Sequence, residues 1–362
     1  MKKVKSILFR VNAKGRGIIN FDASHQKRLT KYMFFGPERN DDNISYSKKV
    51  FSIDEEGRTT YKIMVSSQCV NHEVYGMEVP SMGQDIVAIE DLKFDFIASK
   101  TALLRGYMLT DSSKTEDAKG AVIKRKSPIT LTDFIQTNNA KSYIPIGTAS
   151  GVRDSNSMYF KETIGDIEYA SIGNSINLRE LQFVSLDVRH DREAFSAEKF
   201  DLFREKFTET YPEFKSEIKY FLTNGSKIKI PELGFILPND IMLDMLKFYF
   251  KNLLFTRITR NKSFFEVNDV QIKLVRDPFV DTYSNEDGWM DLDLDTINNL
   301  DFDVEDFYTE FNSEEAEMIL GNIKDFTKDK KENKKNLKDK EAEKKDKIKA
   351  KKEAKKNEEV SK

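Results

Sequence analysis

The sequence predicts an α+β domain with large insertions, followed by a charged C-terminal tail. Short runs of β-branched and aromatic residues, separated by Gly, Ser, Asn and Pro, fill most of the first 190 positions. This pattern is typical of strands joined by loops. Convincing helical patterns come later, at 194–211 and 241–254. Because the predicted strands come first in the chain and the predicted helices come late, an α+β fold is favoured over an alternating β-α-β sheet.

The first strands are expected close to the N-terminus. Residues 4–22, VKSILFRVNAKGRGIINFD, are interpreted as two strands around Gly15 and Gly17. A hairpin is expected from 50–53 and 59–65, with the glycine of its DEEGR loop in the turn. Two serines follow where a helix N-cap belongs, so a short helix is predicted over the next residues, QCVNHEVYG.

The middle of the chain, 91–187, alternates apolar runs with loop residues, so we expect strands and long loops there rather than helices. The phenylalanines of 194–211 fall mostly on one face of an amphipathic helix, and 241–254 is expected to be a second, buried helix. Between these helices the pair Asn224-Gly225 is a strong hairpin signal.

Composition limits the classes of protein that fit. The 362 residues contain one cysteine, Cys69, and three histidines without zinc-ligand spacing, so neither a disulfide, a structural metal nor a cofactor is expected. No stretch reaches the roughly 18–20 apolar residues of a membrane span, and the N-terminus returns to charge too soon for a secretory signal. We therefore expect a cytoplasmic protein that makes no contact with a membrane.

The net charge of −2 hides a strong segregation of charges. Residues 281–323 hold 14 acidic residues and no Lys or Arg, whereas 328–362 hold 16 Lys against 9 acidic residues. Subtracting both blocks leaves about +5 for residues 1–280. A mildly basic body suits a polyanion partner.

The expected organisation follows these changes in composition. The parts are a body at 1–280 with insertions at about 85–185 and a hairpin at about 220–237, an acidic segment at 281–325, and a lysine-rich tail at 326–362 that is helical or disordered.

Residues for catalysis are few. His190-Asp191 is more typical of a solvated ion-pair network than of an oriented imidazole, and Cys69 with His72 is more typical of a buried thiol beside a hydrogen-bonded histidine. The KGRG run at 14–17 lacks the ending of a phosphate loop, and DLDLD at 291–295 is expected to be a solvated acidic surface. An enzyme is therefore not expected.

Polyanion binding is the better interpretation, because it requires only cations, hydrogen-bond donors and stacking faces. The stretch 121–140, AVIKRKSPITLTDFIQTNNA, combines three adjacent cations with polar residues that carry almost no further charge. The basic candidates along the chain are Arg16, Lys27, Arg28, Lys48, Lys49, Arg105, Lys124, Arg125 and Lys126.

Several segments resemble a known family. Residues 62–76, KIMVSSQCVNHEVYG, are similar to the strand-to-helix entry of the backbone subunits of CRISPR effector complexes. The neighbouring segments NISYSKKVF, LLRGYML, KRKSPITLTDFIQTNN and SIGNSINLRELQFVSLD fit the same pattern. The resemblance is to the RAMP superfamily, in particular the Cascade-type backbone protein that polymerises along CRISPR RNA, and it covers roughly residues 4–260.

The resemblance implies a modified ferredoxin-like core of the RNA-recognition-motif type. It also implies CRISPR RNA, target nucleic acid, head-to-tail copies of the chain and other effector-complex subunits as partners. The turn at Ser66, Ser67 and Gln68 would then bind phosphate at a helix N-terminus, with His72 on the face of that helix. Residues 124–126 would contact phosphates, and Asn138 and Asn139 would bond sugar or phosphate oxygens.

A projecting thumb hairpin is also implied, and the hairpin around Asn224-Gly225 is the candidate, with Ile228, Ile230 or Leu233 as a wedge between bases. Some members of the superfamily cleave target RNA with a loop aspartate. Asp41 or Asp42 would be the candidate here, although a non-catalytic subunit is the favoured interpretation.

Two alternatives stay open at the level of sequence. One is a general single-strand nucleic-acid-binding protein with an acidic regulatory segment, and the other is an assembly protein without nucleic acid. A backbone subunit should copurify with RNAs of uniform length, which neither alternative predicts. Its acidic segment would screen or dock on the basic surface of the next subunit.

Overall fold

The structure is a computed structural model. It describes residues 3–20, 44–45, 47–53, 56–76, 100–110, 122–143, 146–148, 158–161, 163–187, 194, 205, 208–209, 211–212, 219–223, 231–260, 263–302, 308–311, 314–315, 318–319 and 321–322. The chain forms two compact units, which are treated separately. Unit 1 comprises 1–107, 126–183 and 237–306, and unit 2 comprises 108–125, 184–236 and 307–362.

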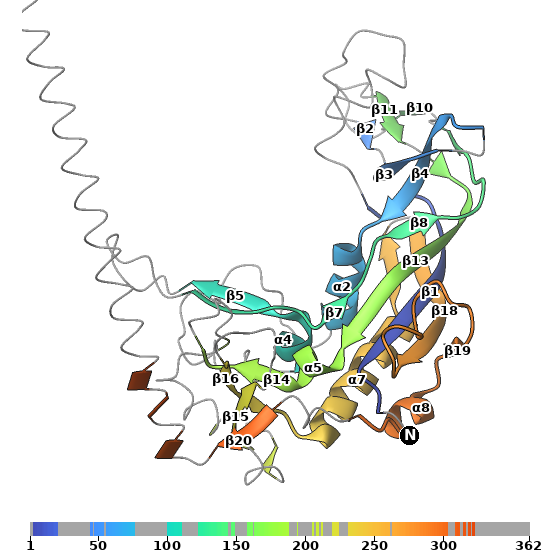
Figure 1. The fold of residues 1–362 in the computed structure, drawn as a ribbon. Helices are drawn as coiled ribbons and strands as arrows, with labels where there is room; N and C mark the ends of the chain where they lie inside the picture. The colour runs from blue at the N-terminus through green and yellow to red at the C-terminus, as the bar shows by residue number, and fades with distance from the viewer. Residues whose placement is uncertain are drawn as a thin grey trace, which may run out of the picture. The chain divides into compact units, whose positions relative to one another are not determined.

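A nine-stranded antiparallel sheet forms the frame of unit 1 (Figure 1). Its strand order is β17-β18-β1-β13-β8-β4-β3, with β19 paired to β18 and β7 paired to β13. The strands are β1 (Ser6–Arg16), β3 (Lys49–Ile53), β4 (Thr59–Val65), β7 (Ile129–Thr130), β8 (Phe134–Gln136), β13 (Asp166–Asn177), β17 (Arg257–Arg260), β18 (Ser263–Val275) and β19 (Met290–Asp291). The α+β class with antiparallel sheets is thereby confirmed.

The prediction of two strands around Gly15 and Gly17 is wrong, because a single strand, β1, runs through to Arg16. Gly15 lies inside the ladder, where an added Cβ would stand 2.7 Å from the carbonyl oxygen of Phe264. Gly17 has φ 74° and ends the strand. The glycines therefore permit close approach of β18 and termination of the strand, rather than a hairpin turn.

Two helices cover the inner face of the sheet: α2 (Ser67–Gly76) and α7 (Asn239–Leu254). Alternate residues of β1 are buried on this face. Phe9 packs edge-on against Tyr249 and Phe250, with ring centroids 6.1 and 5.7 Å apart. Tyr75 of α2 also contacts Tyr249. The predicted hairpin β3–β4 and the predicted helices α2 and α7 are thus confirmed.

The chain between 91 and 187 contains helices where only strands and loops were expected. Both α4 (Lys100–Arg105) and α5 (Leu178–Gln182) are short helices. Four residues of α4 in succession are buried, so its apolar run is a buried helix rather than a strand. For α5, the side chain of Asn177 accepts a hydrogen bond from the Glu180 amide and starts the helix.

Two small sheets complete the description of unit 1. One contains β2 (Ile44–Ser45), β10 (Ile146–Thr148) and β11 (Met158–Lys161), and the other contains β9 (Ser142–Tyr143) and β12 (Thr163–Ile164).

Unit 2 contains a four-stranded sheet in the order β14-β16-β15-β20 and a two-stranded sheet of β5 and β6. The strands are β5 (Tyr107–Thr110), β6 (Val122–Arg125), β14 (Phe183–Ser185), β15 (Tyr220–Thr223), β16 (Leu233–Ile236) and β20 (Tyr308–Phe311). Most of the helix expected at 194–211 lies outside the described residues, with 205, 208 and 209 helical.

The candidate thumb at 220–237 contains two antiparallel strands, β15 and β16. Leu233 is fully buried and packs against Tyr220 and Leu222, so its suggested role as a wedge between bases is wrong. The hairpin signal Asn224-Gly225 and the other two wedge candidates, Ile228 and Ile230, lie outside the described residues.

The first part of the acidic segment packs on unit 1. β19 pairs with β18, the short helix α8 (Leu294–Asn298) buries Ile297, and Phe302 forms a bridge with Val4. Residues 323–362, including the lysine-rich tail, lie outside the described part of the chain. Among the residues that the structure describes, no helix is long and apolar enough to span a membrane.

Candidate nucleic-acid interface

The N-terminus of α2 is already occupied by groups of the protein. The carbonyl oxygen of Ser66 accepts the amides of Cys69 and Val70, and the Ser66 hydroxyl accepts a 2.7 Å hydrogen bond from Asn20 Nδ2. The Ser67 amide donates to Asp133 Oδ1, also at 2.7 Å. A phosphate at this terminus would therefore have to displace a carboxylate that fills the same position.

Asp133 is held in place by a polar network between the β7–β8 connection and β13. The amide of Thr132 donates to Asn174 Oδ1 at 2.7 Å, and the Ser171 hydroxyl donates to the Thr132 carbonyl at 2.9 Å. Ser171 and Asn174 are both buried, beside Gly173, whose φ is 86°. The carboxylate that caps α2 therefore comes from a rigid support.

Lys48 lies next to the same helix terminus. Its amide donates to the Asn20 carbonyl and its carbonyl accepts from the Met64 amide, both at 2.9 Å. The structure thus brings together the predicted residues Lys48, Ser66 and Ser67, which are up to 19 positions apart, through Asn20. Asn20 and Asp133 were missed, because neither forms a local motif with the residues that it contacts.

The β3–β4 hairpin projects from the end of the main sheet (Figure 1). Only Met64 and Val65 of β4 pair with β8. Phe51 and Ile53 are 68% and 74% exposed on one face of the hairpin, and Tyr61 lies directly opposite Phe51. The two rings have centroids 4.8 Å apart and an interplanar angle of 48°.

An exposed aromatic pair on a projecting element is a stacking surface of the kind that single-stranded nucleic acids use. The predicted residue Lys49 lies on the same face, two positions before Phe51. Sequence reasoning missed the two aromatic residues. The available signal was the alternation KVFSI, which becomes informative only when the apolar side is known to face solvent.

Arg16 and Asn138 meet at the start of β13. The Arg16 guanidinium donates to both carboxylate oxygens of Asp166, at 2.8 and 3.0 Å, and Asn138 Nδ2 donates to the Asp166 carbonyl at 3.1 Å. The hydrogen bond from Arg16 lowers the pKa of the Asp166 carboxyl. Asn139 is exposed one position further along.

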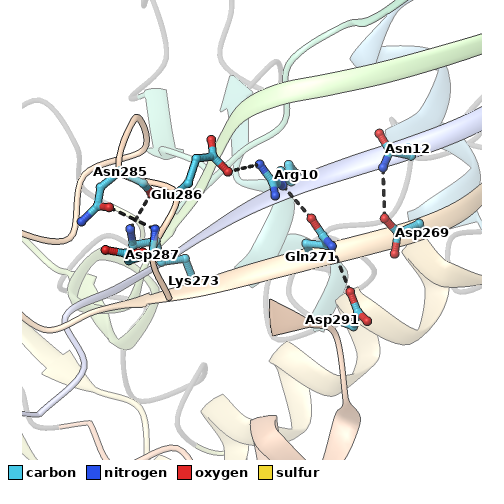
Figure 2. A network of polar contacts seen from close by, with 9 residues as sticks. All are labelled: Arg10, Asn12, Asp269, Gln271, Lys273, Asn285, Glu286, Asp287 and Asp291. Carbon is cyan, nitrogen blue, oxygen red and sulfur yellow. Dashed lines mark hydrogen bonds and ion pairs between the residues drawn. The ribbon is translucent and has the colours of Figure 1, made fainter. Parts of the chain in front are cut away.

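The outer face of the sheet carries balanced charges rather than a basic patch. Lys14 pairs with Glu266 at 2.8 Å, Asn12 donates to Asp269 at 3.0 Å, and Arg10 donates to Gln271 at 2.7 Å and to Glu286 at 3.1 Å (Figure 2). The hydrogen bond from Lys14 lowers the pKa of Glu266. Each side chain named on β1 therefore meets a group on a neighbouring segment.

The acidic segment closes part of this face. The Arg10 guanidinium lies 4.6 Å from the ring centroid of Trp289. Lys273 Nζ donates to the Asn285 carbonyl at 2.9 Å, and both residues are drawn in Figure 2. Lys273 is only 2% exposed. Both cations therefore bind groups within unit 1, although the Arg10 side chain remains 30% exposed.

The three adjacent cations at 124–126 differ in environment. Lys124 is half-buried, Arg125 is 7% exposed, and Lys126 is exposed with its amine 3.6 Å from Glu180. Arg105 is exposed at the last residue of α4. Lys126 and Arg105 thus present their charges to solvent, whereas Arg125 presents very little.

The candidates for chemistry are similarly limited. His72 is exposed on α2, and burial raises the pKa of the half-buried Cys69 thiol, so Cys69 is not an activated thiolate at neutral pH. Among the described residues no group of His, Cys, Asp and Glu is arranged to hold a metal ion. The other candidates, Lys27, Arg28, Asp41, Asp42, His190 and Asp191, lie outside the described residues.

Comparison with known proteins gives a family match. The model for "Type I-Fv CRISPR-associated protein Cas7fv-like" matches residues 3–278. No curated protein matches the sequence. One solved chain, from a "CRISPR RNA-guided surveillance complex", is 10% identical over 78% of this chain and 76% of its own, with a TM-score of 0.33.

A second solved chain, from a "CRISPR RNA-guided surveillance complex, pre-nicking", is 10% identical over 74% of this chain and 75% of its own, with a TM-score of 0.36. Both TM-scores are low, so the functional argument rests on the family model and on the residues themselves.

Proposed function

Because the chain belongs to the Cas7fv-like family of type I-Fv CRISPR-associated proteins, we propose that it is a guide-RNA-binding backbone subunit of a CRISPR effector complex. The family match over residues 3–278 is the observation that carries this function. It also confirms the family that the sequence resembled. The partners of such a subunit are CRISPR RNA, target nucleic acid, further copies of the chain and the other subunits of the complex.

A ferredoxin-like core is part of the proposal. The order β18-β1-β13-β8 corresponds to the 4-1-3-2 order of a split β-α-β-β-α-β unit. Along the chain, α2 lies between β1 and β8, and α7 lies between β13 and β18. All neighbouring strands in this set are antiparallel, as that unit requires. In this description the β3–β4 hairpin is an insertion between the first strand and the first helix.

We place the guide RNA along the end of the sheet where β1 finishes and the β3–β4 hairpin begins. This end combines Lys48 and Lys49 with the exposed Phe51–Tyr61 pair, so phosphates and bases both find partners. The exposed side chain of Gln68 adds a donor at the start of α2. The hairpin β3–β4 takes the thumb role that the sequence suggested for 220–237, because its apolar residues are exposed whereas Leu233 is buried.

The subunit in this proposal is non-catalytic and acts in the cytoplasm. Its residues position the RNA through phosphate contacts and stacking, which require no proton transfer. Neutral Cys69 and the charge-balanced outer face of the sheet fit a structural role.

The first experiment is to purify the full chain expressed with its own operon and to size the extracted nucleic acid before and after RNase treatment. A discrete RNase-sensitive band of uniform length is the expected result. Heterogeneous nucleic acid would indicate a general single-strand binder, and a preparation free of nucleic acid would contradict the proposed function.

A further inference from the structure

Large apolar side chains are exposed at two separate places along the long strand β18. Phe279 and Val280, in the turn after its last residue, are 93% and 61% exposed. Phe255 is 76% exposed between α7 and β17, and β17 pairs with the first residues of β18. The amide of Val267 donates to the carbonyl of Thr256, so Phe255 lies beside the middle of β18. The eight steps from Val267 to Val275, at about 3.3 Å each, place roughly 25 Å of strand between the two sites.

The exposure of Phe279 is imposed by the backbone of its turn. The carboxylate of Asp281 accepts the amides of Arg276 and Asp277 at 2.8 and 2.9 Å, and these bonds lower the pKa of Asp281. The amide of Phe279 donates to Asp277 Oδ1 at 3.1 Å. The aromatic ring therefore stands on an ordered turn, and a partner would bind it without ordering a loop first.

The two sites have opposite charges around them. Residues 277–301 contain eight acidic residues and no Lys or Arg. Phe255 is accompanied instead by exposed Lys251, Arg257 and Arg260, of which Arg257 lies 3.6 Å from Glu266. The aromatic site with acidic neighbours and the aromatic site with basic neighbours are complementary to each other. Apolar anchors inside charged rims are the usual composition of a protein interface.

We infer that Phe279 and Val280 of one copy dock on the Phe255 surface of the next copy. This inference rests on the proposed function, since it identifies the contact through which backbone subunits join along the guide. Because the two surfaces consist of different residues at separate places on unit 1, the contact is heterologous and repeats from copy to copy instead of closing a pair.

Cross-linking tests the contact directly, because the chain has only one native cysteine. In a Cys69→Ser background, the full chain with Phe255→Cys and Phe279→Cys is oxidised with copper phenanthroline in the presence of guide RNA. We expect a ladder of covalent multimers. Either cysteine alone should give none, and neither should the control pair Phe255→Cys with Ile172→Cys, since Ile172 is also exposed but lies in β13. No ladder, or an equal ladder from the control pair, would overturn the inference.

Mixing two defective copies tests whether the contact is heterologous. Phe279→Ala and Phe255→Ala should each weaken association between copies at least about tenfold, the size of a hot-spot loss. Mixed together, the two variants should form dimers and stop, because each supplies the surface that the other lacks. Both side chains are exposed, so their unfolding temperatures should match that of the unmodified chain.

The RNA content of the same preparations separates the two proposals. Guide RNA of uniform length without cross-linking would overturn the contact and leave the proposed function standing. Absence of guide RNA from every preparation would instead contradict the proposed function. If Phe255→Ala weakens binding of a short RNA to single copies while Phe279→Ala does not, Phe255 contacts RNA and the docking inference is wrong.

Discussion

Single residues decide how closely the strands of unit 1 approach one another. Gly15 lies in the middle of the sheet, and its missing side chain leaves room for the backbone of β18. Arg16, its neighbour, spans to the adjacent strand β13 and pairs with Asp166. Neither role involves a partner molecule, although both residues lie in a glycine- and cation-rich run that sequence patterns associate with phosphate binding.

Gly15→Ala should destabilise the fold by about 1–3 kcal/mol, because the new methyl group would stand 2.7 Å from the Phe264 carbonyl and the strands would have to separate. Thermal or denaturant unfolding measures this loss. Gly165→Ala is the matched control, since nothing lies within 4 Å of its added Cβ. Equal stability of the two variants would show that the sheet accommodates a side chain at position 15.

The Arg16–Asp166 pair predicts a specific pH dependence. The pKa of Asp166 is lowered from its ordinary value of 3.8 by the hydrogen bond from Arg16, so the pair stabilises the folded state above that value. This contribution is lost as the pH falls through the lowered pKa. NMR titration of the Asp166 carboxyl should show the lowered pKa, and Arg16→Gln should return it toward 3.8. An Asp166 pKa unchanged by Arg16→Gln would contradict the assignment.

Among the elements, α2 shows that a local sequence signal can predict where a helix starts without identifying the distant residue that caps it. The serines at its start suggested a self-contained cap, yet the amide of Ser67 is satisfied by Asp133, 66 positions later. The residue before Asp133, Thr132, is in turn held by Ser171 and Asn174 of β13. The helix terminus is therefore a junction of three elements rather than an open anion site.

Asp133→Ala should cost about 0.5–2 kcal/mol of stability, the range measured for loss of an N-cap side chain. Asp133→Asn keeps an oxygen acceptor for the Ser67 amide and should recover most of the loss. Chemical denaturation of the three proteins side by side gives the comparison. If Asn is as damaging as Ala, the negative charge rather than the hydrogen bond stabilises α2.

The β3–β4 hairpin should contribute to RNA affinity without contributing much to stability. Phe51 and Tyr61 are exposed in the free subunit, so the double change to Ala should leave the unfolding temperature nearly unchanged. Affinity for single-stranded RNA should fall by about 1–3 kcal/mol for each base that stacks there. Fluorescence anisotropy with a labelled oligonucleotide measures it, with Ile172→Ala as an exposed apolar control on β13. Unchanged affinity would remove the hairpin from the interface.

At the scale of the whole molecule, charge is distributed unevenly along the chain, and several cations of unit 1 form ion pairs within the fold. The body of the chain carries about +5, yet Arg10, Lys14 and Arg16 are each paired with a carboxylate. A count of cations therefore overstates how many side chains are available to bind phosphates. The salt dependence of RNA binding measures how many cations contact the RNA.

The logarithm of the RNA association constant should fall linearly with the logarithm of salt concentration, by about 0.7 for each phosphate neutralised on a single strand. Changing Lys48 and Lys49 together to Ala should lower the slope by about 1.4. Lys219→Ala, which removes a lysine paired with Glu310 in unit 2, should leave the slope unchanged. An unaltered slope for the double variant would move the phosphate contacts elsewhere.

The sequence by itself determined the α+β class, the β3–β4 hairpin, helices α2 and α7, and the family. These features depend on interactions between near neighbours in the chain: alternation in strands, apolar periodicity in helices and turn residues between them. The family was recognisable because the segment 62–76 keeps a strand, a serine turn and a helix in direct succession.

Only the tertiary structure decided which candidate groups face solvent. Gly15 became a position of close strand contact, Leu233 a core residue, Arg125 a nearly buried cation, and Phe51 and Phe279 exposed aromatic residues. The physical reason is that burial and pairing depend on segments far apart in the chain, as when Asp133 reaches Ser67 or Asp166 reaches Arg16. A local pattern records which groups a residue carries, whereas the folded arrangement determines which of them have already found a partner.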